Sequence, residues 1–170
     1  MFQRLDREEV FSSHWLKLFL DTVTDDRNVT LKYNVVHVRR ESVVVMVRKG
    51  DQLLLTENYR YPIEKVQLEF PAGEIEKGET PFQAAEREVY EETGVQIQCQ
   101  PATFSFYPSN GLSDQRIHIV FGEYMDGELN PQYEIMKCFW MDEKEWKGRL
   151  ALGEITDAAS LIAYLYSLLF

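Results

Sequence analysis

The sequence lacks the features of secreted, membrane-spanning and zinc-binding proteins. Its two cysteines, Cys99 and Cys138, do not have the close spacing of a zinc site and are too few to staple a secreted domain of 170 residues. No stretch approaches the roughly 18 consecutive apolar residues of a membrane span. The opening residues also lack the apolar run of a signal peptide. We therefore expect a cytoplasmic protein that has no membrane partner.

Internal repeats, low-complexity tracts and flexible linkers are also missing, and positive charge is in short supply. The formal net charge is −10, from 28 acidic and 18 basic residues. Such a balance argues against a nonspecific nucleic-acid partner, because nucleic acids repel an acidic surface. An anionic ligand would need a divalent cation or a local arginine cluster to offset the same repulsion.

What is present is enough for one folded domain of ordinary size. A hydrophobic content of 45% and an aromatic content of 13% are typical of a protein with a real core. Residues 15–23 and 30–38 have strand-like composition around a turn at residues 25–28, which predicts an N-terminal hairpin. Residues 71–78 are predicted to be a loop. Further strands are predicted at residues 42–48, 52–57, 66–70, 96–98, 102–107, 117–124 and 137–141.

Three helices are predicted, and one of them carries clear boundary signals. Thr80 is a good N-cap, Pro81 fits the first helical position, Gln83 completes a capping box and Gly94 supplies a stop. Residues 142–150 and 157–170 are the other two predicted helices. The order strands, helix, strands, helix favours a mixed α/β sandwich over a doubly wound fold.

The helix at residues 80–93 carries a cluster of carboxylates. Glu88, Glu91 and Glu92 lie within a sector of about 100° of the helical wheel. Like charges at this spacing weaken a helix, so a hard divalent cation with oxygen ligands is a natural partner. Arg87 lies four residues before Glu91 and is placed to pair with it. For residues 87–93 taken alone, a solvated, salt-bridged surface helix is the alternative.

The stretch around this helix matches a longer pattern. Residues 73–95 read GEIEKGETPFQAAEREVYEETGV, and the pattern is G-x5-E-x7-R-E-U-x-E-E-x-G-U, where U is apolar. The sequence therefore resembles the Nudix hydrolase family, whose signature this is. The fixed positions are filled by Gly73, Glu79, Arg87, Glu88, Glu91, Glu92 and Gly94, and the apolar ones by Val89 and Val95.

Other segments are similar to the ADP-ribose pyrophosphatase branch of that family, which acts on nucleoside-diphosphate sugars. These segments read NYRYP, LEFPAGEIEKGE, NGLSDQRIHIV and ITDAASLIAYL. The resemblance implies a Nudix-type α/β/α sandwich over residues 42–170. It also implies an N-terminal antiparallel β extension over residues 1–41, through which two copies form a homodimer.

The resemblance implies a reaction and a cofactor. The expected reaction is the hydrolysis of the pyrophosphate bond of ADP-ribose or GDP-mannose type compounds, and the expected cofactor is Mg²⁺, with Mn²⁺ as its substitute. The Ala72 carbonyl, Glu88 and Glu92 would bind the metal, and Glu91 would be a further ligand. Arg87 belongs to the expected catalytic set.

Substrate roles follow from the same resemblance. Arg60 would contact a substrate phosphate, and Glu69 would help to shape the sugar-phosphate pocket. Ser109, Asn110 and Gly111 would contact the substrate. Asn110 stands where ADP-ribose-preferring relatives usually have proline, so the resemblance supports the class of nucleoside-diphosphate sugars more than strict ADP-ribose specificity.

The general base has two candidates. Glu134 precedes a predicted strand where relatives carry a carboxylate, and Glu91 is the second candidate. Two other functions stay open. One is the hydrolysis of nucleoside triphosphates, dinucleoside polyphosphates or NADH, and the other is a non-catalytic nucleotide-binding module. The complete set of box glutamates argues against the binding module, and the segments NYRYP and NGLSDQRIHIV argue against the other substrates.

Overall fold

The computed structural model describes residues 1–132 and 135–169 of the chain. These residues form two compact units. The first unit contains residues 1–41 and 106–116, and the second contains residues 42–105 with the described part of residues 117–170. The division into a β extension of residues 1–41 and a catalytic domain of residues 42–170 stays a prediction.

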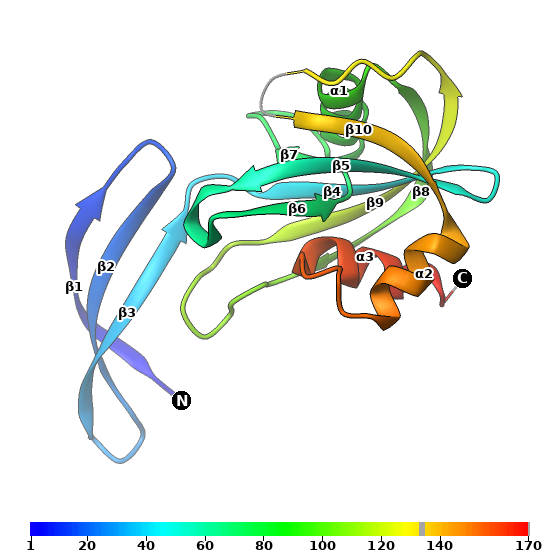
Figure 1. The fold of residues 1–170 in the computed structure, drawn as a ribbon. Coiled ribbons are helices and arrows are strands. Elements are labelled where there is room, and N and C mark those ends of the chain that lie inside the picture. Colours follow the sequence, from blue (N-terminus) through cyan, green and yellow to red (C-terminus); the bar gives the residue numbers. More distant parts are fainter. Residues whose placement is uncertain (133–134, 170) are drawn as a thin grey trace. The chain divides into compact units, whose positions relative to one another are not determined.

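The first unit is a three-stranded antiparallel sheet. Its strands β1 (Gln3–Ser12), β2 (Leu16–Thr24) and β3 (Thr30–Val38) lie in this order (Figure 1). β2 and β3 pair along their whole length, which confirms the N-terminal hairpin expected from the sequence. The sequence does not predict β1, because all of its residues are exposed and no buried face imposes an alternating pattern. Its strand conformation comes from pairing with β2.

This sheet has a small core. Among the described residues of the unit, Asp21 and Val23 are the buried ones, at 4% and 8% exposure. Arg7 Nε and Nη2 each donate to the Asp21 carboxylate at 2.7 Å, and the Arg7 guanidinium lies 4.3 Å from the centroid of the Phe19 ring. The hydrogen bonds from Arg7 lower the pKa of Asp21. A charge-assisted fork therefore holds β1 to β2 where apolar packing is scarce.

Residues 107–116 run beside β3. The Tyr33 hydroxyl donates to the Gly111 carbonyl at 2.8 Å. The Asp114 carboxylate accepts the Val38 amide at 3.0 Å and lies 2.5 Å from His37 Nδ1. The segment thus belongs to the first unit, although it connects two strands of the second.

The second unit is built on a seven-stranded mixed sheet. The strand order is β10-β5-β4-β9-β8, with β6 paired to β5 and β7 paired to β4. β4 is parallel to β9 and antiparallel to β5 and β7. The strands are β4 (Ser42–Lys49), β5 (Gln52–Arg60), β6 (Lys65–Glu69), β7 (Ala72–Glu74), β8 (Gln96–Phe106), β9 (Ile117–Asp126) and β10 (Ile135–Asp142).

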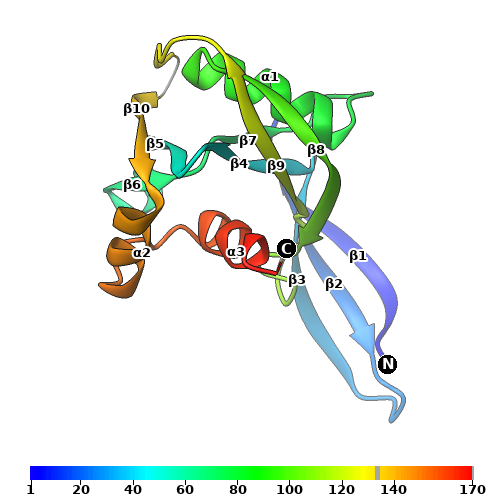
Figure 2. The same cartoon turned by 90° about the vertical axis from the view of Figure 1, so that its right-hand side faces the viewer.

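Helices cover both faces of this sheet. α1 (Pro81–Thr93) lies on one face and α3 (Ala158–Ser167) on the other, beside α2 (Glu143–Ala151) (Figures 1 and 2). A short 3-10 turn, η1 (Tyr61–Ile63), follows β5. The mixed α/β class expected from the sequence is therefore confirmed. None of the helices in the described ranges is long and apolar enough to cross a membrane.

α1 forms where the local signals predict it. The Thr80 hydroxyl accepts the Gln83 amide, and the Gln83 side chain accepts the Thr80 amide, which completes the capping box. Pro81 occupies the first turn, and Gly94 ends the helix with φ +77°. This left-handed conformation suits glycine, and a Cβ at this position would lie 2.7 Å from the Glu128 carbonyl oxygen.

α1 packs its small residues against β4. Ala84, Ala85 and Val89 are fully buried, and they share one cluster with three valines of β4. The valines are Val43, Val45 and Val47. Burying a valine side chain contributes roughly 1.5–3 kcal/mol, so this contact fixes the position of the helix and of the carboxylates on its other side.

The opposite face is held by aromatic rings and one ion pair. Trp146 of α2 is fully buried, stacks on Phe70 with ring centroids 4.9 Å apart, and meets Tyr164 of α3 edge-on at 5.8 Å. Glu143 accepts hydrogen bonds from Arg48 Nη1 at 2.9 Å and from the Tyr164 hydroxyl at 2.8 Å. These bonds lower the pKa of Glu143 to about 2, with Arg48 as the largest cause.

Several predicted boundaries differ from the structure. Residues 72–74 form β7 within a segment predicted to be a loop, because their backbone pairs with Val43 and Val44 of β4. Residues 58–60 continue β5, because they pair with β6. The two short strands predicted at residues 96–98 and 102–107 form the single strand β8. In β5 and β7, hydrogen bonds from a distant strand extend structure that the local composition does not indicate.

Candidate active site

The carboxylates of α1 face the backbone of β7. A Cβ built on Gly73 would lie 2.0 Å from the Glu88 side-chain carbon Cδ, so glycine is what allows this carboxylate to lie against β7. The Glu88 side chain is 15% exposed. Glu92 lies one helical turn further along and accepts the Ala72 amide at 3.3 Å. The structure therefore brings together Ala72, Glu88 and Glu92, three of the predicted metal-site residues.

Arg87 holds the acidic residues around it in place. Its Nε and Nη2 donate to the Glu79 carboxylate, both at 2.8 Å, and Nη2 also donates to the Glu74 carbonyl at 2.9 Å. Its Nη1 donates to Glu88 at 2.8 Å and to Glu91 at 3.1 Å. The bonds from Arg87 lower the pKa of Glu79 to about 2. Arg87 thus sets the positions of three box glutamates.

Glu88 and Glu92 are carboxylates in an unfavourable environment. Burial, followed by the charge of the neighbouring Glu88, raises the pKa of Glu92 to about 8. Burial also raises the pKa of Glu88, in spite of its bond from Arg87. A cation beside two half-buried carboxylates stabilises their charged forms.

The donors available here fit a hard divalent ion. No group of three or more His, Cys, Asp or Glu side chains is arranged to hold a metal within the described ranges. Mg²⁺ commonly takes one or two carboxylates and completes its six positions with main-chain carbonyls, waters and substrate phosphates. Glu88 and Glu92 beside the partly buried strand β7 supply the two carboxylates of such a site, so the residues present suit the metal.

A second polar cluster lies at the end of β5 and β6. Arg60 Nε donates to Glu69 Oε1 at 2.8 Å, and Arg60 Nη2 pairs with Glu69 Oε2. Glu69 is 4% exposed, whereas the Arg60 side chain is 48% exposed. The Glu69 bond raises the pKa of Arg60, and the charges of Asp157 and Glu92 add to this effect. Arg60 is therefore within electrostatic reach of Glu92 and presents part of its guanidinium to solvent.

Sequence reasoning missed one residue of this cluster. Asn58 is 8% exposed and donates from Nδ2 to Glu69 Oε2 at 3.1 Å. Thr56, Asn58 and Arg60 alternate along β5, so they point to one face of the sheet. Polar residues at every second position of a strand were the signal that could have identified this face.

Three predicted substrate-contacting residues and the two candidate bases complete the predicted site. Ser109, Asn110 and Gly111 belong to the first unit, where the Ser109 carbonyl accepts the amides of Leu112 and Ser113. Glu134 lies outside the described residues, so the choice of general base stays a prediction. Glu91, the second candidate, has a side chain that is 40% exposed.

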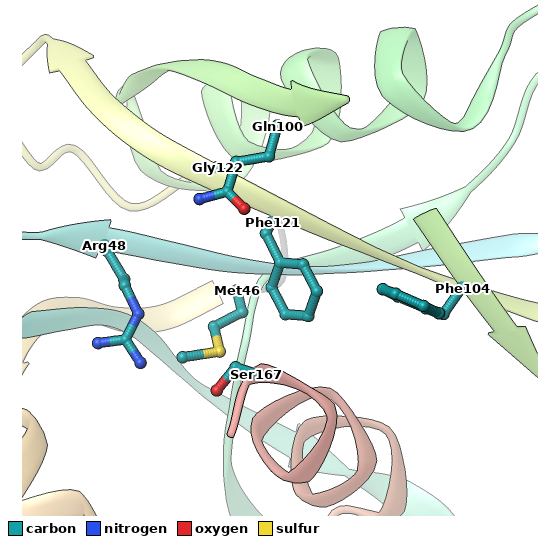
Figure 3. Close-up of a pocket in the computed structure, with 7 residues that line it drawn as sticks. All are labelled: Met46, Arg48, Gln100, Phe104, Phe121, Gly122 and Ser167. Carbon is teal, nitrogen blue, oxygen red and sulfur yellow. The ribbon is translucent and has the colours of Figure 1, made fainter. Parts of the chain in front are cut away.

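The second unit has a cavity away from this cluster. It has a volume of about 340 Å³ and lies on the α3 face of the sheet (Figure 3). Figure 3 shows Phe121 and Met46 from two neighbouring strands together with Ser167 at the end of α3. The cavity is lined by Met46, Arg48, Gln100, Phe104, Phe121, Gly122 and Ser167, none of which is a predicted site residue.

The chain is similar to known proteins. A family model described as NUDIX domain matches residues 38–163. The methanol dehydrogenase activator of Bacillus methanolicus is 36% identical over 123 residues, which cover 72% of this chain and 66% of that protein. The ADP-ribose pyrophosphatase of Bacillus subtilis (strain 168) is 30% identical over 117 residues, which cover 69% of this chain and 63% of that protein. The chain thus spans slightly less than two thirds of the length of these two relatives.

A solved structure is similar over most of the chain. It is described as an ADP compounds hydrolase, and the two structures agree with a TM-score of 0.80. The sequence identity is 21%, and the match covers 95% of this chain and 89% of that chain. At this identity the likeness concerns the fold.

Proposed function

Because the chain belongs to the Nudix hydrolase family, we propose that it hydrolyses the pyrophosphate bond of nucleoside-diphosphate sugars, of the ADP-ribose and GDP-mannose type. The products would be a nucleoside monophosphate and a sugar phosphate. Family membership and the Nudix-type sandwich, both expected from the sequence, are confirmed by the family match and by the likeness in fold.

One observation carries the proposal. Glu88 and Glu92 are half-buried side by side, and Arg87 holds Glu88 and its neighbours with five hydrogen bonds. Burial raises the pKa of both carboxylates, and the charge of Glu88 also raises that of Glu92, so a cation at this place would stabilise both charges. We assign this place to Mg²⁺, with Mn²⁺ as substitute, held by the Ala72 carbonyl, Glu88 and Glu92, and with Glu91 as a further ligand.

A bound divalent ion supplies charge neutralisation at the phosphoryl oxygens and makes water a better nucleophile. The chain supplies the rest. The exposed edge of Arg60 binds a phosphate of the substrate through its remaining N–H groups. Glu134 or Glu91 accepts the proton of the attacking water as the new P–O bond forms and the bridging P–O bond breaks. Arg87 acts through the carboxylates that it positions.

Two features support the expected homodimer and the expected cytoplasmic location. Leu5, Val10 and Phe11 are exposed on β1, whose outer edge has no partner strand in the first unit. An unpaired edge strand that exposes apolar side chains favours pairing with a second copy, which supports a homodimer. The free thiols Cys99 and Cys138 support a reducing compartment such as the cytoplasm.

A substrate panel tests the proposal. Purified protein with Mg²⁺ is offered ADP-ribose, GDP-mannose, ADP-glucose, UDP-glucose, ATP, NADH and diadenosine polyphosphates, and the products are identified by chromatography. Release of nucleoside monophosphate chiefly from the sugar compounds is the expected result. A preference for ATP, NADH or the dinucleoside polyphosphates would replace the substrate class. If no compound is cleaved, the function is that of a nucleotide-binding module.

A further inference from the structure

Asn58 lies in the polar cluster of β5 and β6, and its orientation is fixed by chemistry. Its Nδ2 donates to Glu69 Oε2 at 3.1 Å and to the Thr56 hydroxyl at 3.2 Å. The Glu69 carboxylate, paired with Arg60, accepts hydrogen bonds and cannot donate them. The amide nitrogen of Asn58 must therefore face Glu69, and the amide oxygen must face away from it.

That oxygen has no hydrogen-bond partner among the described residues and is closed off from solvent. A buried carbonyl without a donor destabilises a folded protein, because the water that it bonds in the unfolded chain is lost. An apolar side chain of similar size would avoid this loss. Fold stability therefore does not explain why asparagine stands at this position, and a role at the site does.

The role follows from the charges around Arg60. Its guanidinium is attracted by the carboxylates of Glu69, Asp157 and Glu92, which come from three different elements. If Arg60 swung to Glu92, it would neutralise one of the two carboxylates assigned to the metal. Glu69 holds the Nε and Nη2 side of the planar guanidinium, which leaves the opposite edge for a phosphate.

Glu69 can hold Arg60 only if its own carboxylate is held. The third side-chain donor to Glu69 is Asn58, which binds the same oxygen that pairs with Arg60 Nη2. We propose that Asn58 is a positioning residue that locks Glu69, so that Arg60 presents its free edge to a substrate phosphate and stays away from Glu92. This inference rests on the proposed function, because it takes Arg60 as the phosphate-binding residue.

A double-mutant cycle tests the proposal. The four proteins are the wild type, Asn58→Leu, Arg60→Ala and the double variant, each assayed with ADP-ribose and Mg²⁺. In the protein that keeps Arg60, Asn58→Leu should raise KM about tenfold and change kcat little. The reason is the loss of the hydrogen bond from Asn58 that holds the charged Glu69 carboxylate in place. With Arg60→Ala already present, Asn58→Leu should have almost no further effect on kcat/KM.

Thermal unfolding of the metal-free proteins separates this role from a structural one. Asn58→Leu should change Tm little, because removal of the unpaired oxygen offsets the loss of the hydrogen bond to Glu69. Ser160→Ala is the matched control, since the buried Ser160 hydroxyl accepts the Phe70 amide on the α3 face at 2.8 Å. That variant should lower Tm and leave KM unchanged. Asn58→Ala, which has no side-chain donor, repeats the cycle with a smaller side chain in case leucine does not fit.

The outcomes are distinct. Equal losses of kcat/KM in both Arg60 backgrounds, or a lower Tm with an unchanged KM, would overturn the positioning role while leaving the hydrolase intact. A wild-type protein that cleaves no nucleoside-diphosphate sugar would overturn the proposed function itself, together with the role of Arg60 on which the inference depends.

Discussion

Glu143 and Glu92 lie on opposite faces of the same sheet, and the protein shifts the pKa values of their carboxylates in opposite directions. Glu143 accepts hydrogen bonds from Arg48 and Tyr164, and its pKa falls to about 2. Glu92 accepts one backbone amide at 3.3 Å, and burial beside Glu88 raises its pKa to about 8. Both side chains are largely enclosed by the same unit, so burial alone does not explain the difference.

The difference lies in what the fold provides for each charge. Around Glu143 the chain itself supplies the cation and the hydroxyl, so the carboxylate is complete without any ligand. Around Glu92 the chain supplies a second carboxylate, so the charge is incomplete until something is bound. A carboxylate whose charge is unfavourable in the ligand-free protein indicates a functional site better than a carboxylate that is only buried.

The largest expected effect concerns turnover. Glu92→Gln should lower kcat by on the order of 10³-fold at saturating Mg²⁺, because a metal ligand and its charge are lost. Glu143→Gln should leave kcat within about twofold of the wild type, since Glu143 only joins structural elements. Steady-state kinetics on ADP-ribose measure both. Wild-type turnover in Glu92→Gln would contradict the assignment of the metal site to this face of the sheet.

The second largest effect is expected from a change in the backbone next to Glu88. In Gly73→Ala the new methyl group would collide with the Glu88 carboxyl group, which must then move away from β7. A displacement of about 1 Å in such a site costs on the order of 10²-fold in kcat/KM. Gly148→Ala is the control, because a Cβ there meets nothing within 4 Å. Equal activity of the two variants would show that Glu88 does not need its position against β7.

A smaller effect is expected on the stability of the other face. Glu143→Gln should lower the free energy of unfolding by about 2 kcal/mol, because Arg48 loses its charged partner and Tyr164 loses its charged acceptor. Urea unfolding at pH 7 measures this change. Glu92→Gln, unfolded in EDTA, should be at least as stable as the wild type. If both variants were destabilised equally, the two glutamates would have to be regarded as structural alike.

The last prediction is a pH dependence of stability. Glu92 has a folded pKa of about 8, above its unfolded value near 4.5, so the folded state holds the proton more tightly. Its contribution to stability is complete below pH 4.5 and is lost as the pH rises through 8. The Tm of metal-free protein should therefore fall between pH 5 and pH 8, and less so in Glu92→Gln. For Glu143 the sign is reversed, because its stabilisation is lost only as the pH falls from about 4.5 through 2.

The sequence was most informative where structure depends on local chemistry. The helix at residues 80–93 has its cap, its proline, its stop and its apolar face within one segment, and all of them are found in α1. The spacing of Glu88, Glu91 and Glu92 likewise places them on one side of a helix without any knowledge of the fold.

The sequence was less informative where structure depends on distant partners. β7 exists because β4 lies beside it, and β1 because it pairs with β2. The helical wheel does not distinguish the half-exposed Glu91 from the enclosed Glu92, because the difference comes from the backbone of β7. Asn58 was missed for the same reason, since its importance depends on Glu69, eleven residues further along the chain.

The passage of residues 106–116 back to the first unit has a consequence for biosynthesis. A ribosome delivers β1, β2 and β3 early, but the segment that bonds to Tyr33 and His37 emerges only after more than sixty further residues, including β4 to β8. At about 5–20 residues per second, this delay lasts several seconds. During that time the nascent N-terminal sheet lacks the hydrogen bonds that Gly111 and Asp114 make with β3, so this edge of the sheet is open to pairing with other extended chains.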